Sequence, residues 1–213
     1  MLLAIDFDGT LCEQDTVDWF SAQWAPGVFA EADRRLHAGE IDLDTCLQLQ
    51  VAPITKPEAE VVAFLVETIR VRPGAHELVA FCAERGIEPV IVSSGFENLM
   101  RPILAANGLD LPISAHAVEC GPEGMRVRFR GRAHCDLCGT ACKRAEVRAL
   151  AAGRPIAYVG DGISDLCAAE DADLRFARHT LARHLAAEGL PFTPFEDMHD
   201  VRRGLAAAFD GAA

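Results

Sequence analysis

The stretch LLAIDFDGT at residues 2–10 begins with four apolar residues and continues through two aspartates, Asp6 and Asp8, to a glycine. A short apolar run that ends in polar residues and glycine is typical of a strand buried inside a parallel sheet. The pattern returns in EPVIVSSGF at residues 88–96 and in RPIAYVGDGISD at residues 154–165. Longer helical patterns separate these runs, so the sequence predicts an α/β fold, a Rossmann-like parallel sheet with helices on both faces.

The segment between the first two strand runs has a different pattern. Residues 12–72 hold several amphipathic helical stretches, such as VFAEADRRLHAG, and no run typical of a strand. We therefore expect a small all-helical insert over residues 12–72 and an α/β core formed by residues 1–11 and 73–213. Farther along, two alternating segments flank GPEG at residues 121–124 and predict a hairpin.

Charge and cysteine content limit the partners and the compartment. The chain has 20 Lys and Arg against 32 Asp and Glu, a formal net charge of −12, which disfavours nucleic acids and anionic membranes as partners. Asp6 interrupts the N-terminal apolar run after five residues, too early for a signal peptide or a membrane span. We expect a cytoplasmic protein whose eight cysteines are mostly reduced thiols or metal ligands. The sequence leaves the oligomeric state open.

Two pairs of carboxylates follow predicted strands. Asp6 and Asp8 come after the first strand, and Asp161 and Asp165 come after the third. The carboxyl ends of parallel strands meet at one edge of the sheet, where open α/β folds bind their ligands. Because converging carboxylates repel one another unless a hard cation joins them, we expect a Mg²⁺ site. Mg²⁺ in turn suits a phosphorylated substrate.

A phosphate group at this edge needs hydrogen-bond donors and a positive charge. Ser93, Ser94 and the amide near Gly95 end the second strand run and begin a helical pattern, whose N-terminus favours anions. Lys143 opens another helical pattern, whereas the competing Lys56 lies in the insert. We therefore expect Lys143 to bind phosphate.

The order of these motifs resembles the haloacid dehalogenase-like phosphohydrolases. The four motifs of that family match DFDGT, the serine after the second strand run, Lys143 and GDGISD, and its C1-type cap matches the helical insert. The match covers essentially the whole chain. Asp8 speaks against the dehalogenase branch, which lacks an acid at that position, so the resemblance implies a phosphatase.

The resemblance also implies roles for the motif residues. Asp6 is expected to attack phosphorus and form an aspartyl phosphate, while Asp8 protonates the leaving alcohol and then activates water. Mg²⁺ is expected on the Asp6 carboxylate, the Asp8 backbone carbonyl and Asp161, with Asp165 orienting the metal site. The residues expected to hold the phosphoryl group are Thr10, Ser93, Ser94, Gly95 and Lys143.

Finer features resemble particular members of the family. DFDGTLCEQDTVDWF and the later PFEDMHDVRRGL look like the methionine-salvage phosphatases that act on 2-hydroxy-3-keto-5-methylthiopentenyl-1-phosphate. The cysteine-rich run that ends in lysine also resembles the phosphocholine/phosphoethanolamine and pyridoxal phosphate phosphatases. Phosphoserine phosphatases share the cap type but use Glu where this chain has Asp15, which we expect to contact the substrate. The expected substrate is a small phosphorylated metabolite, with phosphoserine as a weaker alternative.

The run HCDLCGTACKR at residues 134–144 leaves three alternatives open. Its cysteines are Cys135, Cys138 and Cys142. Their spacing suits zinc, with Cys120 or His134 as the fourth ligand, but they can equally be packed thiols or form a disulfide. In each case we expect a structural role, fixing the helix that carries Lys143. A zinc or redox module without catalytic activity is the rival function, and the intact acidic motifs speak against it.

Overall fold

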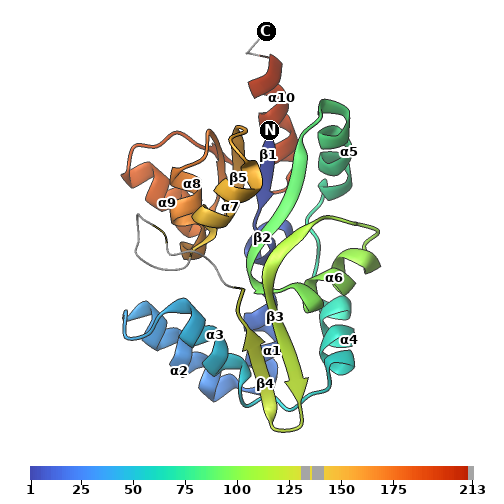
Figure 1. The fold of residues 1–213 in the computed structure, drawn as a ribbon, viewed down its shortest axis with the longest axis vertical. Coiled ribbons are helices and arrows are strands. Elements are labelled where there is room, and N and C mark those ends of the chain that lie inside the picture. Colours follow the sequence, from blue (N-terminus) through green and yellow to red (C-terminus); the bar gives the residue numbers. More distant parts are fainter. Residues whose placement is uncertain (131–134, 136–141, 211–213) are drawn as a thin grey trace.

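The computed structural model describes residues 1–130, 135 and 142–210, and its centre is a seven-stranded sheet (Figure 1). The strand order is β4-β3-β2-β1-β5-β6-β7. The strands are β1 (Leu2–Ile5), β2 (Glu88–Phe96), β3 (Ile113–Gly121), β4 (Gly124–Arg128), β5 (Ile156–Gly160), β6 (Leu174–Ala177) and β7 (Thr193–Pro194). The α/β fold predicted from the strand runs is confirmed.

The sheet is mostly parallel rather than wholly parallel. β3 and β4 pair antiparallel, because the short GPEG turn that joins them can only return the chain alongside itself. The other strand pairs in the described sheet are parallel. β1 lies at the centre, where its last residue, Ile5, pairs with Ile91 on one side and Val159 on the other. The loops after β1 and β5 and the end of β2 therefore meet at one edge.

Helices cover both faces of the sheet. Leu3 and Ile5 face a cluster that includes side chains of α5, α6 and α10, whereas Leu2 and Ala4 face a cluster that includes side chains of α7, α8 and α9. A strand buried on both faces is apolar at successive positions, which explains the continuous run in the sequence. These helices are α5 (Ala75–Arg85), α6 (Glu97–Ala106), α7 (Lys143–Ala151), α8 (Leu166–Glu170), α9 (His179–Ala187) and α10 (Met198–Asp210).

Between β1 and β2, four helices precede α5 in the sequence. Their bounds are α1 (Thr16–Trp24), α2 (Pro26–His37), α3 (Leu43–Val51) and α4 (Glu58–Thr68). The segment leaves and rejoins the core at one place, because Cys12 and Val71 form a β-bridge. Figure 1 shows α2 and α3 beside the β3–β4 hairpin, where Gln48 of α3 accepts from Val127 N (3.0 Å) and donates to Met125 O (3.2 Å). The hairpin thus anchors the helical segment through the backbone of β4.

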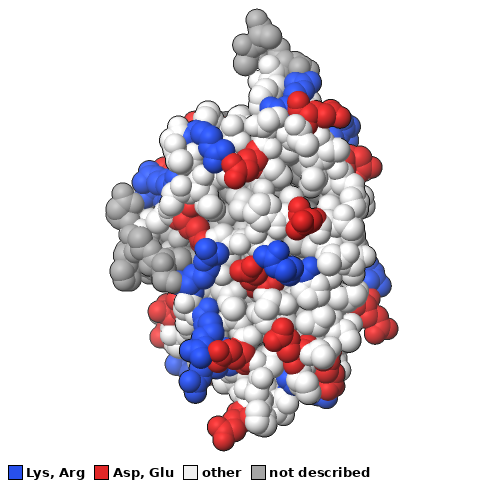
Figure 2. All heavy atoms as spheres, turned by 45° about the vertical axis from the view of Figure 1, so that its right-hand side comes forward, with Lys and Arg blue, Asp and Glu red and all other residues white. Residues whose placement is uncertain are grey.

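The outer surface mixes both signs of charge. Figure 2 shows Lys and Arg side chains interspersed with Asp and Glu side chains over one face of the molecule. Within the described ranges, the helices are all too short or too polar to cross a membrane.

Candidate active site

Asp6 and Asp8 belong to the turn that leaves the central strand. Asp6 follows β1 directly, and Asp8 lies in the turn η1 (Phe7–Leu11), where its own backbone is extended. Gly9 in this turn has a φ of +69°, and a Cβ there would lie 2.6 Å from Oδ2 of Asp161. Glycine therefore allows the turn to approach the acidic loop that follows β5.

The ammonium group of Lys143 lies between two carboxylates. Its Nζ donates to Oδ1 of Asp6 at 2.6 Å and to Oδ1 of Asp165 at 2.7 Å. Lys143 begins α7, yet its side chain points inward and is only 1% exposed. Burial lowers the pKa of Lys143, but the two carboxylates outweigh it and hold the pKa above its usual value. The lysine therefore stays charged at neutral pH.

Asp165 is held by donors from its own loop and strand. Its Oδ1 also accepts from the hydroxyl of Tyr158 at 2.8 Å. Its Oδ2 accepts from the backbone N–H groups of Asp161 and Gly162, both at 2.9 Å. Because protein donors occupy both oxygens, Asp165 fixes the loop after β5 and the position of Lys143.

A divalent cation fits among the acidic side chains. Carboxylate oxygens of Asp6, Asp161 and Asp165 lie within 4.8 Å of one another. Burial, with the negative charge of Asp165 next, raises the pKa of Asp6 well above its usual value although Lys143 opposes the shift. Carboxylate oxygens are the hard ligands that Mg²⁺ prefers, and a divalent cation would offset the repulsion among these buried carboxylates. The hydroxyl of Thr10 donates to Oδ1 of Asp161 at 2.9 Å and so orients one member of this set.

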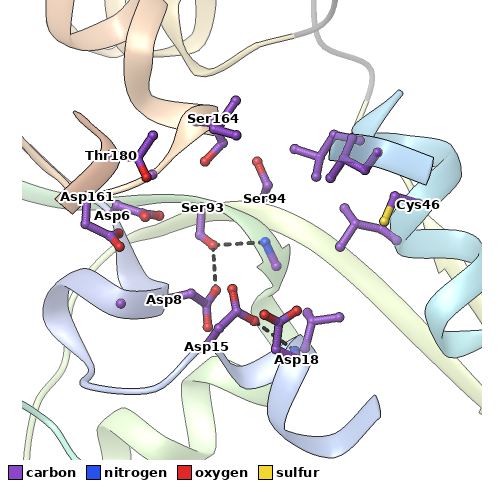
Figure 3. Close-up of a pocket in the computed structure, with 18 of the residues that line it drawn as sticks. Asp6, Asp8, Asp15, Asp18, Cys46, Ser93, Ser94, Asp161, Ser164 and Thr180 are labelled. Atoms are coloured by element: carbon purple, nitrogen blue, oxygen red, sulfur yellow. Dashed lines mark hydrogen bonds between the residues drawn. The ribbon is translucent and has the colours of Figure 1, made fainter. Parts of the chain in front are cut away.

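Asp8 is positioned by helix α1 and strand β2. Its Oδ1 accepts from both the backbone N–H and the hydroxyl of Thr16, each at 2.7 Å. Its Oδ2 accepts from Ser93 Oγ at 3.2 Å, a bond that Figure 3 marks. Burial first, and then the charge of Asp15, raise the pKa of Asp8 to about 7, although the Thr16 donors act in the opposite direction. A carboxyl group with this pKa can both give and take a proton near neutral pH.

The end of β2 borders the same space. Ser93, Ser94 and Gly95 all line the cavity, and Gly95 N donates to Ser93 Oγ at 2.9 Å. A Cβ at Gly95 would lie 2.6 Å from Cε of Met100 and 2.9 Å from Oδ2 of Asp8. Glycine therefore lets the backbone pass close to Asp8 without displacing its carboxylate or the end of Met100.

The cavity has a volume of about 670 Å³ and lies between the sheet edge and helices α1 to α3. Asp6, Asp8, Lys143 and Asp161 line it from the core. Its helical side carries apolar residues, acidic residues and two other polar residues, His37 and Gln50. The apolar ones include Val17, Leu36, Leu43 and Leu47, and the acidic ones are Asp15, Asp18 and Asp33. Lys143 is the only lysine or arginine among the described residues that line it.

Two residues predicted to contact the substrate, Asp15 and Thr10, instead make hydrogen bonds within the protein. Asp15 lines the cavity, but it is also the N-cap of α1, where its Oδ1 accepts from Asp18 N at 2.9 Å (Figure 3). Thr10 is fully buried, and its hydroxyl donates to Asp161 instead of facing the cavity.

Sequence reasoning missed three side chains that support the site. Thr16 holds Asp8, Tyr158 holds Asp165, and Cys167 lies beside two cysteines of the cysteine-rich run. Thr16 had a weak signal, since a hydroxyl next to the N-cap Asp15 is common at helix starts. Tyr158 had none, because an aromatic residue inside a strand run also suits a plain core position.

The predicted cysteine site is only partly described. The sulfur atoms of Cys135, Cys142 and Cys167 lie within 4.8 Å of one another. Cys120 is on β3 and does not belong to this group. Cys138 and His134, which we also considered as ligands, lie outside the described residues.

Comparison with known proteins supports the chemistry that the site suggests. A family model described as haloacid dehalogenase-like hydrolase matches residues 3–170. The 2-hydroxy-3-keto-5-methylthiopentenyl-1-phosphate phosphatase of Bacillus thuringiensis subsp. konkukian (strain 97-27) is 31% identical over 206 residues, covering 94% of this chain and 93% of that protein. The enzyme of the same name from Bacillus cereus (strain G9842) is also 31% identical, over 205 residues.

Solved structures show the same fold. A phosphoserine phosphatase with an analogue of the phospho-aspartyl intermediate superposes with a TM-score of 0.70 at 20% identity, covering 95% of this chain and 97% of that one. A substrate-bound phosphoserine phosphatase complex gives the same TM-score at 19% identity, covering 95% and 96%. The predicted resemblance is confirmed, and the rival hypothesis of a module without catalytic activity finds no support. The chain therefore belongs to the haloacid dehalogenase-like hydrolase family, in which it is a phosphatase.

Proposed function

We propose that this protein uses Mg²⁺ to hydrolyse 2-hydroxy-3-keto-5-methylthiopentenyl-1-phosphate or a closely similar small phosphomonoester. The observation that carries the proposal is the grouping of a nucleophile, an acid and a cation at one end of the cavity. Asp6 is buried against Lys143, and Asp8, with a pKa of about 7, lies next to it. These are the groups that phosphoryl transfer through a carboxylate requires.

The Mg²⁺ ion would be held by the Asp6 carboxylate, the Asp8 carbonyl and Asp161, with Asp165 fixing the loop behind them. When bound, the cation offsets negative charge on the phosphoryl oxygens and on Asp6. Thr10, which we expected on the phosphate, is assigned instead to orienting Asp161, since its hydroxyl already donates there.

The reaction then has two steps. An oxygen of Asp6 attacks phosphorus while the bond to the leaving oxygen breaks, and Asp8 gives its proton to that oxygen. In the second step Asp8 removes a proton from water, the water oxygen attacks phosphorus, and the bond to Asp6 breaks to release phosphate. Lys143 and Ser94 bind the phosphoryl oxygens, because both line the cavity beside Asp6. The Ser93 hydroxyl and the Gly95 amide also line it, but they donate to Asp8 and to Ser93 and would have to exchange these partners for the phosphate.

The helical segment acts as a cap of the C1 type over the core. We assign residues 12–72 to the cap and residues 1–11 and 73–213 to the catalytic core. The β-bridge between Cys12 and Val71 supports these limits, because it marks where the segment leaves and rejoins the core. Helices α1, α2 and α3 of the segment line the cavity and so select the leaving group.

The cavity favours an uncharged thioether tail over an amino acid. Val17, Leu36, Leu43 and Leu47 form an apolar wall that can bury a methylthio group. The substrate named for the Bacillus relatives has such a group. Phosphoserine carries a carboxylate, and the described cap residues around the cavity include no lysine or arginine to bind it. The acidic wall would attract the ammonium group of phosphoserine but repel its carboxylate, which would have no lysine or arginine partner among these residues.

One observation favours a second candidate. Asp15 just before α1, Asp18 in α1 and Asp33 in α2 all line the cavity. Three carboxyl groups together can bind an ammonium group. Phosphoethanolamine or phosphocholine would then be the substrate. Such an enzyme would share the two reaction steps above and differ only in its leaving group.

The test is a panel of phosphomonoesters assayed with Mg²⁺. We expect turnover of p-nitrophenyl phosphate that EDTA abolishes, and the highest kcat/KM for the methylthio-keto substrate. A panel led by phosphocholine or phosphoethanolamine would select the second candidate. Phosphoserine ranking first by about tenfold, roughly 1.4 kcal/mol in transition-state binding, would refute the argument from the cavity wall.

A further inference from the structure

Three cysteines from separate segments converge next to the active site. Cys135 is buried in the segment before α7, Cys142 is the N-cap of α7, and Cys167 is in the first turn of α8. Their sulfur atoms lie within 4.8 Å of one another. Cys142 and Cys167 also line the cavity, so an ion in solution can reach them.

The spacing suits a thiophilic metal ion. Zn²⁺ binds thiolates at about 2.3 Å in a tetrahedral arrangement, which places the sulfurs roughly 3.8 Å apart. A group of three sulfurs within 4.8 Å needs only small side-chain movements to reach that arrangement. Sulfur ligands select zinc over magnesium, whereas the oxygens of Asp6 and Asp161 select magnesium, so the two sites do not compete for one ion.

The surroundings supply positive charge to thiolates. Nη1 of Arg144 lies 3.7 Å from Sγ of Cys135. Arg144 is itself held by Asp171 at 3.5 Å, and Asp171 also accepts from Arg148. The N-terminus of α7 lies at Cys142 and carries a positive partial charge. A zinc ion with three thiolates has excess negative charge, and these groups offset it.

We propose that Cys135, Cys142 and Cys167 bind one Zn²⁺ ion that ties the start of α7 to α8. The described residues supply three ligands, and a tetrahedral ion takes one more. The sequence suggested Cys120 for a zinc site, but the structure brings Cys167 to this group instead.

The position of the ion gives it a structural role. Cys142 directly precedes Lys143, and Cys167 follows Asp165 by two positions. Lys143 and Asp165 are themselves joined by a hydrogen bond of 2.7 Å. A metal that links the two cysteines would therefore fix the lysine relative to the acidic loop. This role, though not the zinc binding, rests on the proposed function of Lys143.

The test measures bound metal directly. The full chain is produced in zinc-supplemented medium, purified with a reductant, and analysed for metals by mass spectrometry. We expect one zinc per chain, lost in Cys142→Ser and in Cys167→Ser and retained in the matched control Cys120→Ser. Adding Co²⁺ to the zinc-free wild-type chain should give an intense thiolate-to-metal absorption, which needs no variant and so does not depend on how variants fold.

Two results would overturn the proposal. The first is a folded wild-type chain without zinc that also lacks the cobalt absorption. The second is a Cys167→Ser variant with the zinc content of the wild type. Mg²⁺-dependent turnover of p-nitrophenyl phosphate, measured on the same samples, separates these results from a failure of the proposed phosphatase function.

Discussion

The Nζ atom of Lys143 lies 2.6 Å from Oδ1 of Asp6, across 137 positions of sequence, in an interior where the lysine side chain is 1% exposed. Burying this pair removes water from both the ammonium group and the carboxylate, which costs free energy. The attraction between the two groups repays that cost only where their geometry is good. The pair is therefore better explained by function than by stability. It places a permanent positive charge beside the oxygen atoms that we expect to attack and bind phosphorus.

The first prediction concerns the two aspartates of the turn after β1. Asp6→Asn should abolish turnover, because an amide cannot form the aspartyl phosphate. Asp8→Asn should keep Mg²⁺ and phosphate binding but lose about 10²–10⁴-fold in kcat, since only the proton transfers are removed. Steady-state kinetics and phosphate titration on both variants check this. Near-normal activity of purified Asp6→Asn would contradict the covalent mechanism.

The second prediction concerns the stability contributed by Lys143. Lys143→Met should destabilise the metal-free protein by about 3–5 kcal/mol at neutral pH, because Asp6 and Asp165 lose a buried cationic partner. The raised pKa of Asp6 means that its neutral form is the one favoured by folding. The stability gained from this preference is fully present below the pKa of Asp6 in the unfolded chain, about 4. It is lost as the pH rises toward the pKa of Asp6 in the folded protein.

Lys143 lowers the pKa of Asp6 in the folded protein, so Lys143→Met should raise that pKa further. The range of pH over which protonation of Asp6 favours folding should then widen. The stability deficit of the variant should therefore shrink as the pH falls from neutral toward about 4. Urea unfolding of both proteins across that range measures it. A deficit that stays constant would show that lost packing, rather than unpaired charge, causes the destabilisation.

The sequence predicted the parts of the site that depend on strand ends. Asp6, Ser93 and Asp161 each follow or end an apolar run, and the rule that parallel strands share an edge is enough to bring them together. Lys143 could be predicted because a lysine at a helix start is uncommon in this lysine-poor chain. These predictions rest on local pattern plus one rule of topology.

The supporting side chains could not be predicted in this way. Tyr158 bonds to Asp165 only because β5 and the loop after it fold back on one another. Thr16 bonds to Asp8 because α1 begins directly above the turn, and Cys167 meets Cys142 because α7 packs against α8. Each contact depends on how two elements are oriented, which a single sequence pattern does not encode.

The third prediction separates two roles for Thr10. Thr10→Val keeps the side-chain shape and removes the hydroxyl that donates to Asp161. If Thr10 orients a metal ligand, Mg²⁺ affinity should fall by about 10–100-fold, and kcat should recover at saturating Mg²⁺. Calorimetric titration with Mg²⁺ and inhibition by inorganic phosphate check the two effects separately. Unchanged Mg²⁺ affinity with weaker phosphate inhibition would return Thr10 to the phosphate-binding role expected from the sequence.

The last prediction uses the contact between helix α1 and Asp8. Thr16 donates its backbone N–H and its hydroxyl to Oδ1 of Asp8, and both bonds lower the pKa of Asp8. Thr16→Val removes the hydroxyl and keeps the backbone donor and the branched shape. Loss of a donor to the carboxylate favours its protonated form, so the pKa of Asp8 should rise above about 7.

The first reaction step needs Asp8 protonated, so kcat/KM should decline on the alkaline side of the pH profile. In Thr16→Val this decline should move to higher pH, whereas Thr16→Ser, which retains the hydroxyl, should follow the wild type. The pH dependence of kcat/KM with Mg²⁺ saturating measures the shift. A lower rate in Thr16→Val without movement of the alkaline limb would mean that Thr16 only holds α1 in place and does not tune the acid.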